Sequence, residues 1–561
     1  MNNKPWLQHY THGVPATINP DTFSSLSHFF EKYADDFPYR PIFTNFGVTL
    51  LYREMKQLVH DFATFLQQGL GLEKGTRIAM MMPNILQYPV AMFGALKAGL
   101  VIVNVNPLYT PPEVAHQLKN AGATAIVVLE NFADRLEKAL PDTNVEHVIV
   151  AKIGDLLGTV KGVVFNFVSR YLKKVIPSYR IPHKIYFKTA LFIGRKHDFE
   201  PVEMKNTDVA FFQYTGGTTG RAKGAMLTHR NLIANVLQCV SWIRDVREQH
   251  QGVMIGALPM YHIFSLTVCG MCILPLGAST VLITNPREIE GFVKDIRHCS
   301  MTMMVGLNTL FNALLNHPKF STVDFSRLKL TIAGGMAMQK SVAERWHEVT
   351  KCVVLQGYGL TESSPVLTLC PISMTHFTGS VGLPVPSTEI VIRDEKNEDL
   401  PFNQVGEICG RGPQVMPGYW HADWETHQSL DGEGWLHTGD IGYMDERGFV
   451  YIVDRKKDMV LVSGFNVYPN EVEAVLSSHP AVQVSAVIGV PSEKTGEALK
   501  AFVVKKDPTL TEAELIAYCR QSLTAYKIPH LIEFRDELPM SPVGKVLRRE
   551  LREKPITPAA S

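Results

Sequence analysis

The chain has 561 residues, of which 45% are apolar and 19% charged, so it is neither a disordered nor a collagen-like chain. Its 55 Lys and Arg nearly balance 54 Asp and Glu, and a net charge of +1 argues against nucleic-acid binding, which normally needs a basic surplus. The length suffices for about three or four domains or subdomains.

Cysteine content and the N-terminal residues indicate the compartment. Eight cysteines are too few to frame a secreted fold of this length, so we expect them in the core of a protein in a reducing cytoplasm. Residues 1–20 have no apolar run of the kind that forms a secretory signal.

Much of the chain up to about residue 380 alternates between apolar runs and amphipathic segments, which is the pattern of parallel α/β sheets. Apolar residues from Leu232 to Ile243 recur at helical spacing, with Thr228 or Asn231 as the cap. The uncharged stretch 252–286 is interrupted by prolines and glycines, so a buried strand–helix–strand explains it better than a membrane span. Runs that predict strands lie at 77–82, 100–105, 123–129, 148–151 and 281–284.

A basic segment lies between residues 156 and 197. It has nine Lys or Arg and no Asp or Glu, and apolar side chains are interleaved from Val163 to Leu172. A basic amphipathic helix is typical of electrostatic docking on an anionic membrane surface. A solvated insertion that packs on the protein body fits the same residues, so both interpretations stay open.

After about residue 380, short strand-like runs alternate with Gly and Pro turns, which predicts a small β-barrel or sandwich. A dense charge run at 454–457 marks a domain boundary, and an α+β pattern follows it, with Asn470 as the cap of a helix that reaches Ser478. The predicted fold is α/β. An N-terminal domain at 1–453 contains α/β subdomains at about 1–200 and 200–380 and a β-barrel at 380–453, and a smaller α+β C-terminal domain spans 458–561.

The segment 214–224, directly after a predicted strand, has the residues of a phosphate-binding loop. Four glycines let successive backbone N–H groups converge, threonines add hydroxyl donors, and Lys223 adds a positive charge. It is not the Walker pattern, because Gly224 follows Lys223 where that pattern has Ser or Thr. The residues expected to hold polyphosphate are Tyr214, Thr215, Gly216, Gly217, Thr218, Thr219, Gly220, Lys223 and Gly224.

Two shorter motifs supply further nucleotide-binding chemistry. In 356–362, Tyr358 offers a ring for stacking on a base, Thr361 a hydroxyl for a phosphate, and Glu362 a hard oxygen ligand for Mg²⁺. In 435–440, the Asp440 carboxylate can accept hydrogen bonds from both ribose hydroxyls. Each motif alone is weak.

Taken in order along the chain, these and further motifs resemble the adenylate-forming superfamily of acyl-CoA synthetases, peptide-synthetase adenylation domains and beetle luciferases. Segments 104–112, 260–264 and 461–471 are most similar to bacterial long-chain fatty-acid CoA ligases of fatty-acid degradation. Pro112 and Met336 depart from that pattern, where arginine and a small residue are more usual, and bear on nucleotide packing. The motifs lie at 214–224, 257–262, 334–336, 358–362, 434–440, 453–458, 462–467 and 538–545.

The resemblance implies a two-step reaction in which ATP converts a carboxylate to an acyl-adenylate, and the CoA thiol then displaces AMP. It implies that Lys545 bridges the fatty carboxylate and the α-phosphate and that His262 lies near the acyl carbonyl. Mg²⁺ on Glu362 would neutralise phosphate charge. Residues implied to hold adenine and ribose are Gly334, Gly335, Met336, Tyr358, Asp440 and Arg455.

The resemblance also implies a mobile C-terminal domain. A hinge at 454–457, with Lys457 as its pivot, would let that domain rotate between the two half-reactions. Rotation would withdraw Lys545 and bring Ser463, Gly464 and Phe465 to the CoA channel.

The motifs determine the reaction more closely than they determine which carboxylic acid is the substrate. A long acyl chain needs an apolar tunnel, whose candidate walls are Phe264, Leu266, Val268 and 301–307. A ligase for medium-chain or aromatic acids, a luciferase-like oxygenase and a non-enzymatic fatty-acid binding partner remain alternatives. We expect long-chain fatty acid, ATP and CoA as partners of a cytoplasmic protein, and docking on the cytoplasmic face of the inner membrane stays open with the interpretation of the basic segment. Its oligomeric state, monomer or homodimer, stays open.

Overall fold

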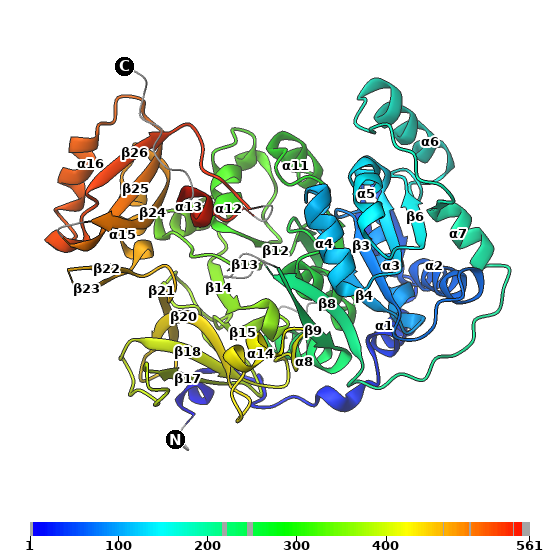
Figure 1. The fold of residues 1–561 in the computed structure, drawn as a ribbon, viewed down its shortest axis with the longest axis horizontal. Coiled ribbons are helices and arrows are strands. Elements are labelled where there is room, and N and C mark those ends of the chain that lie inside the picture. The colour runs from blue at the N-terminus through cyan, green and yellow to red at the C-terminus, as the bar shows by residue number, and fades with distance from the viewer. Residues whose placement is uncertain are drawn as a thin grey trace.

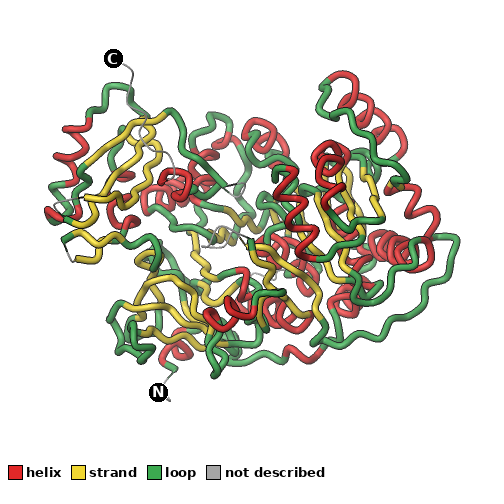
Figure 2. Tube along the Cα trace, in the orientation of Figure 1, coloured by secondary structure: helices red, strands yellow, loops and turns green. Residues whose placement is uncertain are grey.

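The computed structural model describes residues 4–215, 222–243, 251–463, 465–492, 495–541 and 544–552. Two large sheets form the main body, a smaller antiparallel sheet lies beside them, and the C-terminal segment builds a sheet of its own (Figure 1). Strands gather in the interior of the body, and helices lie outside them (Figure 2).

The first large sheet has the strand order β19-β9-β8-β4-β3-β5-β6-β7. From β8 to β7 the strands are parallel, while the β8–β9 hairpin and β19 run antiparallel. The strands are β3 (Arg77–Met81), β4 (Val101–Asn104), β5 (Ala125–Leu129), β6 (His147–Ala151), β7 (Ile185–Tyr186), β8 (Val209–Thr215), β9 (Lys223–Thr228) and β19 (Gly418–Tyr419). Helices of this part are α2 (Tyr52–Thr64), α3 (Gln87–Lys97), α4 (Pro111–Ala121), α5 (Ala133–Ala139), α6 (Thr159–Phe167) and α7 (Phe187–Gly194).

The second large sheet has the order β16-β15-β14-β13-β12-β10-β11-β1-β2, parallel from β14 to β1. Its strands are β1 (Pro41–Asn45), β2 (Val48–Leu51), β10 (Val253–Gly256), β11 (Ser279–Leu282), β12 (Met303–Gly306), β13 (Leu330–Gly334), β14 (Val354–Gly359), β15 (Val366–Leu369) and β16 (Leu383–Pro384). Helices of this part are α1 (Leu26–Asp36), α8 (His229–Trp242), α9 (Ile263–Ser265), α10 (Ile273–Leu276), α11 (Ile289–Ile296), α12 (Asn308–Leu315) and α13 (Lys340–Thr350).

The two large sheets interleave along the chain. β1 and β2 join the second sheet, where Phe43 pairs with Thr280, whereas β8 and β9 join the first. A division near residue 200 therefore does not separate the sheets, and that expectation was wrong. The pairing of β1 with β11 spans more than 200 residues, and local sequence carries no signal for it.

The sequence pattern correctly placed α8 and the uncharged stretch. Thr228 is the cap of α8: its hydroxyl accepts from the Asn231 N–H at 3.1 Å, and Asn231 Oδ1 accepts from the Thr228 N–H at 3.0 Å. Residues 252–286 form β10, α9, a π-helical turn (Leu266–Met271), α10 and β11. Among the described residues, every helix is too short or too polar to cross a bilayer.

The antiparallel sheet comprises β17 (Glu389–Arg393), β18 (Gly406–Arg411), β20 (Leu436–Met444) and β21 (Val450–Arg455), in the order β17-β18-β20-β21. The expected small β-barrel is thus an open sheet with β17 and β21 at the ends of the order. In the described residues, the end strands β17 and β21 do not pair with each other, so the sheet does not close into a barrel.

The C-terminal segment packs around its own apolar core, which includes Val472, Leu499 and Leu515. α15 (Pro469–Ser478) begins one residue before Asn470, because Pro469 fits the first helical position. The other elements are β22 (Val460–Val462), β23 (Phe465–Val467), β24 (Val482–Ser492), β25 (Gly496–Lys505), β26 (Leu531–Arg535), α16 (Glu512–Cys519) and α17 (Arg548–Arg552).

Candidate active site

A cavity of about 2190 Å³ lies where the large sheets, the antiparallel sheet and the C-terminal segment meet. The ends of β8, β13, β14, β20 and β21 reach it, as does the loop that carries Lys545. Most of the predicted site residues that the structure describes line this one cavity, although they come from segments more than 300 residues apart.

Tyr358, Asp440 and Arg455 form a hydrogen-bonded chain on one side of the cavity. The Tyr358 hydroxyl donates to Asp440 Oδ2 at 2.7 Å, and Arg455 Nε lies 2.7 Å from Asp440 Oδ1. Asp440 and Arg455 are cross-strand partners in β20 and β21. Burial raises the pKa of the Asp440 carboxyl, and the charge of Arg455 opposes that rise. This side can therefore present a fixed ring and an oriented carboxylate.

The residues expected to cover the other side of adenine lie at the end of β13. Gly334 lies against the Phe264 ring, since a Cβ there would lie 3.1 Å from it. Gly335 has φ +78°, a conformation that favours glycine, and a Cβ there would lie 3.7 Å from Lys545 Cε. Met336 also lines the cavity.

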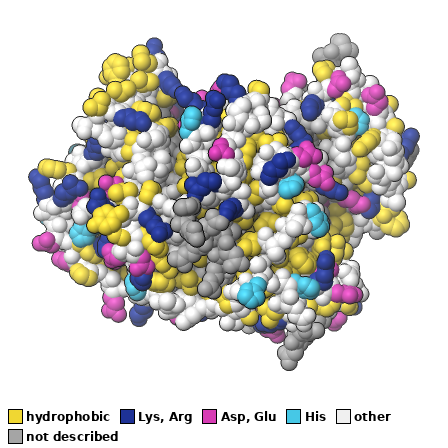
Figure 3. Space-filling model, turned by 180° about the vertical axis from the view of Figure 1, so that it is seen from behind, with side chains coloured by type: hydrophobic (Ala, Val, Ile, Leu, Met, Phe, Trp, Pro, Cys, Tyr) yellow, Lys and Arg dark blue, Asp and Glu magenta, His cyan; other side chains and the backbone are white. Residues whose placement is uncertain are grey.

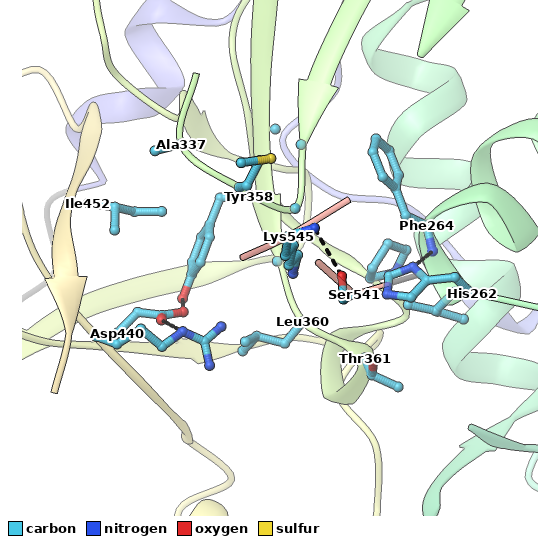
Figure 4. Close-up of a pocket in the computed structure, with 18 of the residues that line it drawn as sticks. His262, Phe264, Ala337, Tyr358, Leu360, Thr361, Asp440, Ile452, Ser541 and Lys545 are labelled. Carbon is cyan, nitrogen blue, oxygen red and sulfur yellow. Dashed lines mark hydrogen bonds and ion pairs between the residues drawn. The ribbon is translucent and has the colours of Figure 1, made fainter. Parts of the chain in front are cut away.

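Lys545 lies in the middle of the cavity. Figure 4 places its side chain between Tyr358 and Asp440 on one side and His262 and Phe264 on the other. Burial, and secondarily Arg455, lower the pKa of Lys545 to about 8, while Asp440 has the opposite effect. The amine is thus positioned between the predicted nucleotide side and the predicted acyl side.

The Lys545 loop is held at both ends. The Lys545 N–H donates to Ser541 Oγ at 2.9 Å, and the Leu547 N–H donates to the Pro539 carbonyl at 2.8 Å. The loop also contacts the N-terminal body, because Thr309 Oγ1 donates to the Gly544 carbonyl at 3.3 Å. These bonds fix where the lysine enters the cavity.

His262 caps α9 at the cavity wall. Its Nδ1 accepts the Phe264 N–H at 3.4 Å, so the ring proton belongs on Nε2. Burial, together with the charge of Lys545, lowers the pKa of His262 to about 3. The imidazole is therefore neutral at pH 7 and can act as a hydrogen-bond donor through Nε2–H.

The predicted phosphate loop connects β8 to β9. Its described ends enter the cavity: Thr215 pairs with Lys223 and Tyr214 with Gly224. The Tyr214 hydroxyl donates to Asn120 Oδ1 at 2.6 Å, and a Cβ on Gly224 would lie 3.1 Å from the Tyr214 ring. Gly216, Gly217, Thr218, Thr219 and Gly220 lie outside the described residues.

Thr361 and Glu362 form a short turn (Thr361–Ser363) at the cavity wall. The Tyr419 hydroxyl donates to Glu362 Oε1 at 2.5 Å. In the part of the chain that the structure describes, no three acidic, His or Cys side chains cluster as a metal cage. Any metal here would rest on one carboxylate and on the substrate, which is how Mg²⁺ is usually held beside phosphates.

The residue predicted as the hinge pivot lines the cavity, whereas the described residues predicted for the CoA channel do not. Lys457 lines the cavity, and burial lowers its pKa. Ser463 and Phe465 lie outside the cavity lining: the Ser463 N–H donates to the Thr495 carbonyl, and the exposed Phe465 ring stacks on Tyr526 at 4.8 Å. Gly464 falls outside the described residues.

Sequence reasoning missed several lining residues. Ile452 and Ala337 lie on the same side of Lys545 as the Tyr358 ring (Figure 4). Tyr419 is held against Glu362 by β19, a two-residue strand that carries no motif. No local signal indicated Ile452, which lies three positions before Arg455 in β21, and none indicated Tyr419.

An apolar arm of the cavity extends from His262 into the core. Phe264 and Val268 line it as expected, whereas Leu266 and residues 301–307 do not. Leu266 lies on the opposite face of the helical turn from Phe264 and Val268, which explains the difference. Other lining residues of the arm are Cys239, Ile243, Met254, Cys272, Ile273, Leu276, Leu330 and Ile332.

Comparison with known proteins places the chain among enzymes of one kind. Residues 30–420 match the family described as AMP-binding enzyme, and residues 471–545 match the AMP-binding enzyme C-terminal domain. A long-chain-fatty-acid–CoA ligase of Escherichia coli O6:H1 is 52% identical over 98% of both chains, and one of Yersinia pestis is 52% identical over 99% of this chain and 98% of its own. ATP-bound MatB from Rhodopseudomonas palustris has a TM-score of 0.78 at 28% identity, covering 94% of this chain and 98% of its own.

Proposed function

The chain belongs to the AMP-binding enzyme family, and on that premise we propose that it ligates long-chain fatty acids to CoA through an acyl-adenylate. A carboxylate oxygen attacks the α-phosphorus of ATP, and pyrophosphate leaves with the electron pair of the broken P–O bond. The CoA sulfur then attacks the acyl carbon, the thiol proton is released, and AMP leaves. The observation that carries this proposal is the position of Lys545 between Asp440 and His262 in one cavity.

The first half-reaction brings two anions together, so its main requirement is electrostatic. The protonated Lys545 amine offsets the charge that develops between carboxylate and α-phosphate. His262, neutral with its proton on Nε2, donates to a carboxylate oxygen without adding charge. Tyr358 supplies the stacking face for adenine, and Asp440, oriented by Arg455, accepts the ribose hydroxyls.

Mg²⁺ is proposed as the ion that accompanies ATP. The Glu362 carboxylate is suited to bind this ion. Its Oε1 accepts a hydrogen bond from Tyr419, which leaves the other oxygen for the ion, and the carboxylate lies on the cavity wall beside Thr361. When bound, the ion would neutralise phosphate charge. Tyr419 would hold the Glu362 carboxylate in place, and Lys223 would contribute a positive charge from the predicted phosphate loop.

The apolar arm supports a long-chain substrate. Its lining residues from Cys239 to Ile332 carry no charge and continue inward from His262, where the carboxylate would lie. An aliphatic chain that fills such an arm is stabilised by roughly 0.8 kcal/mol for each buried CH₂. A short or aromatic acid would leave part of the arm unfilled.

The second half-reaction requires another arrangement of the same parts. The C-terminal segment after Lys457 would rotate, withdraw Lys545 and bring Ser463, Gly464 and Phe465 toward the cavity. Supporting this, Phe465 is 56% exposed and lies outside the cavity lining in the present arrangement. A large exposed aromatic ring is suited to a surface that forms only after rotation.

We also propose that α6 docks on an anionic membrane, where fatty acids arrive. α6 projects from the body (Figure 1), and apolar side chains gather over the corresponding corner of the molecule when it is seen from behind (Figure 3). The apolar stripe runs from α6 into the π-helical turn that continues it (Val168–Leu172), and its members are between 51% and 80% exposed: Val160, Val163, Val164, Phe167, Tyr171 and Leu172. The opposite face packs on the body, since Asn166 Oδ1 accepts the Gly154 N–H at 2.9 Å.

The basic residues of the segment 156–197 are not equally available to lipid. Arg170 pairs with the buried Glu130, and Arg195 pairs with the buried Asp61 at 2.7 Å. Lys173, Lys174 and Lys196 are exposed. Docking therefore combines insertion of apolar side chains with fewer free charges than the nine in the sequence suggest.

A panel of acids tests the proposed function directly. Palmitate, oleate, octanoate and coumarate are each incubated with ATP and CoA, and AMP and acyl-CoA are measured. We expect palmitate or oleate to give the highest kcat/KM. Preference for octanoate or coumarate would contradict the long-chain assignment. Oxygen uptake without CoA dependence would favour the oxygenase, and absence of AMP would favour a binding protein.

A further inference from the structure

Asp454 is a fully buried carboxylate at the end of β21, just before the proposed pivot Lys457. Its Oδ2 accepts the Asn470 N–H at 2.7 Å, and its Oδ1 lies 3.4 Å from Arg548 Nη1. Both partners follow Lys457 in the chain, whereas Asp454 itself pairs with Ile441 of β20. Asp454 thus joins the antiparallel sheet to the C-terminal segment.

The other partners of Arg548 lie on the C-terminal side of the pivot. Arg548 Nη1 is 3.2 Å from Asp458 Oδ2, and Nη2 donates to Asn470 Oδ1 at 2.6 Å. Arg548 Nη2 is also 2.8 Å from Glu473 Oε1. Rotation about Lys457 would carry Arg548, Asp458, Asn470 and Glu473 together as one group. Of the contacts described for Arg548, the one to Asp454 is the one that such a rotation must break.

Arg548 is closely connected to the lysine of the site. It follows Lys545 by three residues, at the start of α17. Leu538 before the lysine loop and Leu551 in α17 pack into the same small apolar cluster. A contact that holds Arg548 in place therefore also holds Lys545 in the cavity.

We infer that Asp454 is a positioning residue that latches the C-terminal domain in the orientation in which Lys545 occupies the cavity. This inference rests on the proposed function, because it assigns Asp454 to the adenylation half of that reaction. Releasing the latch shifts the equilibrium between the two orientations toward the one used for thioester formation. Loss of one hydrogen bond to a charged group corresponds to a shift of about tenfold.

The test compares two conservative substitutions at the same guanidinium. Asp454→Asn removes the charge before the pivot, and Asp458→Asn removes a charge after it. Both substitutions therefore weaken one ion pair of Arg548, but only the first weakens the contact that crosses the pivot. For each variant we measure adenylation by pyrophosphate exchange and thioester formation from supplied palmitoyl-AMP and CoA. The ratio of the two rates reports the equilibrium between orientations.

We expect the ratio of adenylation to thioester formation to fall about tenfold in Asp454→Asn and to change less than about twofold in Asp458→Asn. Retained thioester formation shows that Asp454→Asn is folded. Equal loss of both half-reactions, an unchanged ratio, or the same change in Asp458→Asn would overturn the latch. A wild-type protein that forms neither palmitoyl-AMP nor palmitoyl-CoA would instead overturn the proposed function.

Discussion

The hydroxyl of Tyr358 donates to the carboxylate of Asp440 at 2.7 Å, although 81 residues separate them in the chain. This bond fixes an aromatic ring and an acceptor for hydroxyl groups relative to each other before any ligand arrives. Arg455 pairs with the other carboxylate oxygen of Asp440 and so holds that side chain from the second side. A preorganised set of this kind lowers the entropic cost of binding a nucleoside.

Substitution of Asp440 by Ala is expected to weaken ATP binding. The change removes the ribose acceptor and leaves Arg455 and Tyr358 without their shared partner, so we expect the KM for ATP to rise about 10- to 100-fold. Steady-state kinetics with varied ATP measure this. Tyr358→Phe is the matched control, because it keeps the ring and the carboxylate. If Asp440→Ala leaves the KM for ATP unchanged, Asp440 does not bind the nucleotide.

The pH dependence of adenylation follows from the lowered pKa of Lys545. The amine must be protonated to bridge two anions, and it loses its proton as pH rises through about 8. We expect kcat/KM for adenylation to fall above that pH. Lys545→Arg keeps its charge at high pH, so whatever activity remains should lack this decline. A wild-type profile that stays flat to pH 10 would contradict the assignment.

The same pKa has a consequence for stability. In the unfolded chain a lysine keeps its proton until about pH 10.4, whereas Lys545 in the folded protein loses it near pH 8. Between these values the unfolded state binds more protons, so the free energy of unfolding contributed by this group rises with pH. Denaturant titrations of wild type and Lys545→Met at pH 7.5 and 9.5 measure this effect. Between these pH values, the free energy of unfolding of wild type should rise relative to that of Lys545→Met.

The hinge assignment predicts a selective effect of Lys457→Pro. Proline fixes φ and restricts the preceding residue, so rotation about this position should be hindered. Pyrophosphate exchange should survive, because the present arrangement already places Lys545 in the cavity. Thioester formation should fall by at least about tenfold. Parallel loss of both activities would show that position 457 is not the pivot.

Membrane docking through α6 is tested with vesicles that contain anionic phospholipid. We expect wild-type protein to co-sediment and high salt to remove only part of the binding, since the apolar stripe contributes independently of charge. Phe167→Ser with Leu172→Ser should abolish the salt-resistant part, and Lys173→Gln with Lys174→Gln should reduce the salt-sensitive part.

Trp424→Ser is the control for docking, because Trp424 is 67% exposed but lies on α14 (Asp423–Ser429), in another part of the molecule. Absence of wild-type binding, or equal loss in Trp424→Ser, would show that α6 is a packed insertion with an exposed face and has no role at a membrane.

The sequence predicted the local elements well where a periodic signal existed. The strands from β3 to β6 and the capped helix α8 follow from apolar runs and from the Thr228–Asn231 pair. It could not predict that β1 joins the distant sheet, because long-range pairing leaves no local pattern. The exposure of Phe167 and Leu172 could not be predicted either, because the sequence pattern of an apolar helix face is the same whether protein or solvent covers it.

The same distinction between local and long-range signals applies to the residues of the candidate site. Tyr358, Asp440 and Lys545 were predicted from their motifs, and the structure brings their side chains to one cavity. Tyr419, Ile452 and the contact between Asp454 and Arg548 were missed. Each depends on a tertiary neighbour and not on a spacing along the chain.

The measurement that tests the account most directly is the pair of half-reactions in Lys545→Ala. We expect acyl-AMP formation from palmitate and ATP to fall at least about 100-fold, the scale of one lost electrostatic contact in a transition state. Conversion of supplied palmitoyl-AMP and CoA to palmitoyl-CoA should remain, and Lys506→Ala, at an exposed lysine of the same domain, should retain both activities. Equal loss of both half-reactions in Lys545→Ala, or no loss of acyl-AMP formation, would contradict the role of Lys545 on which the account rests.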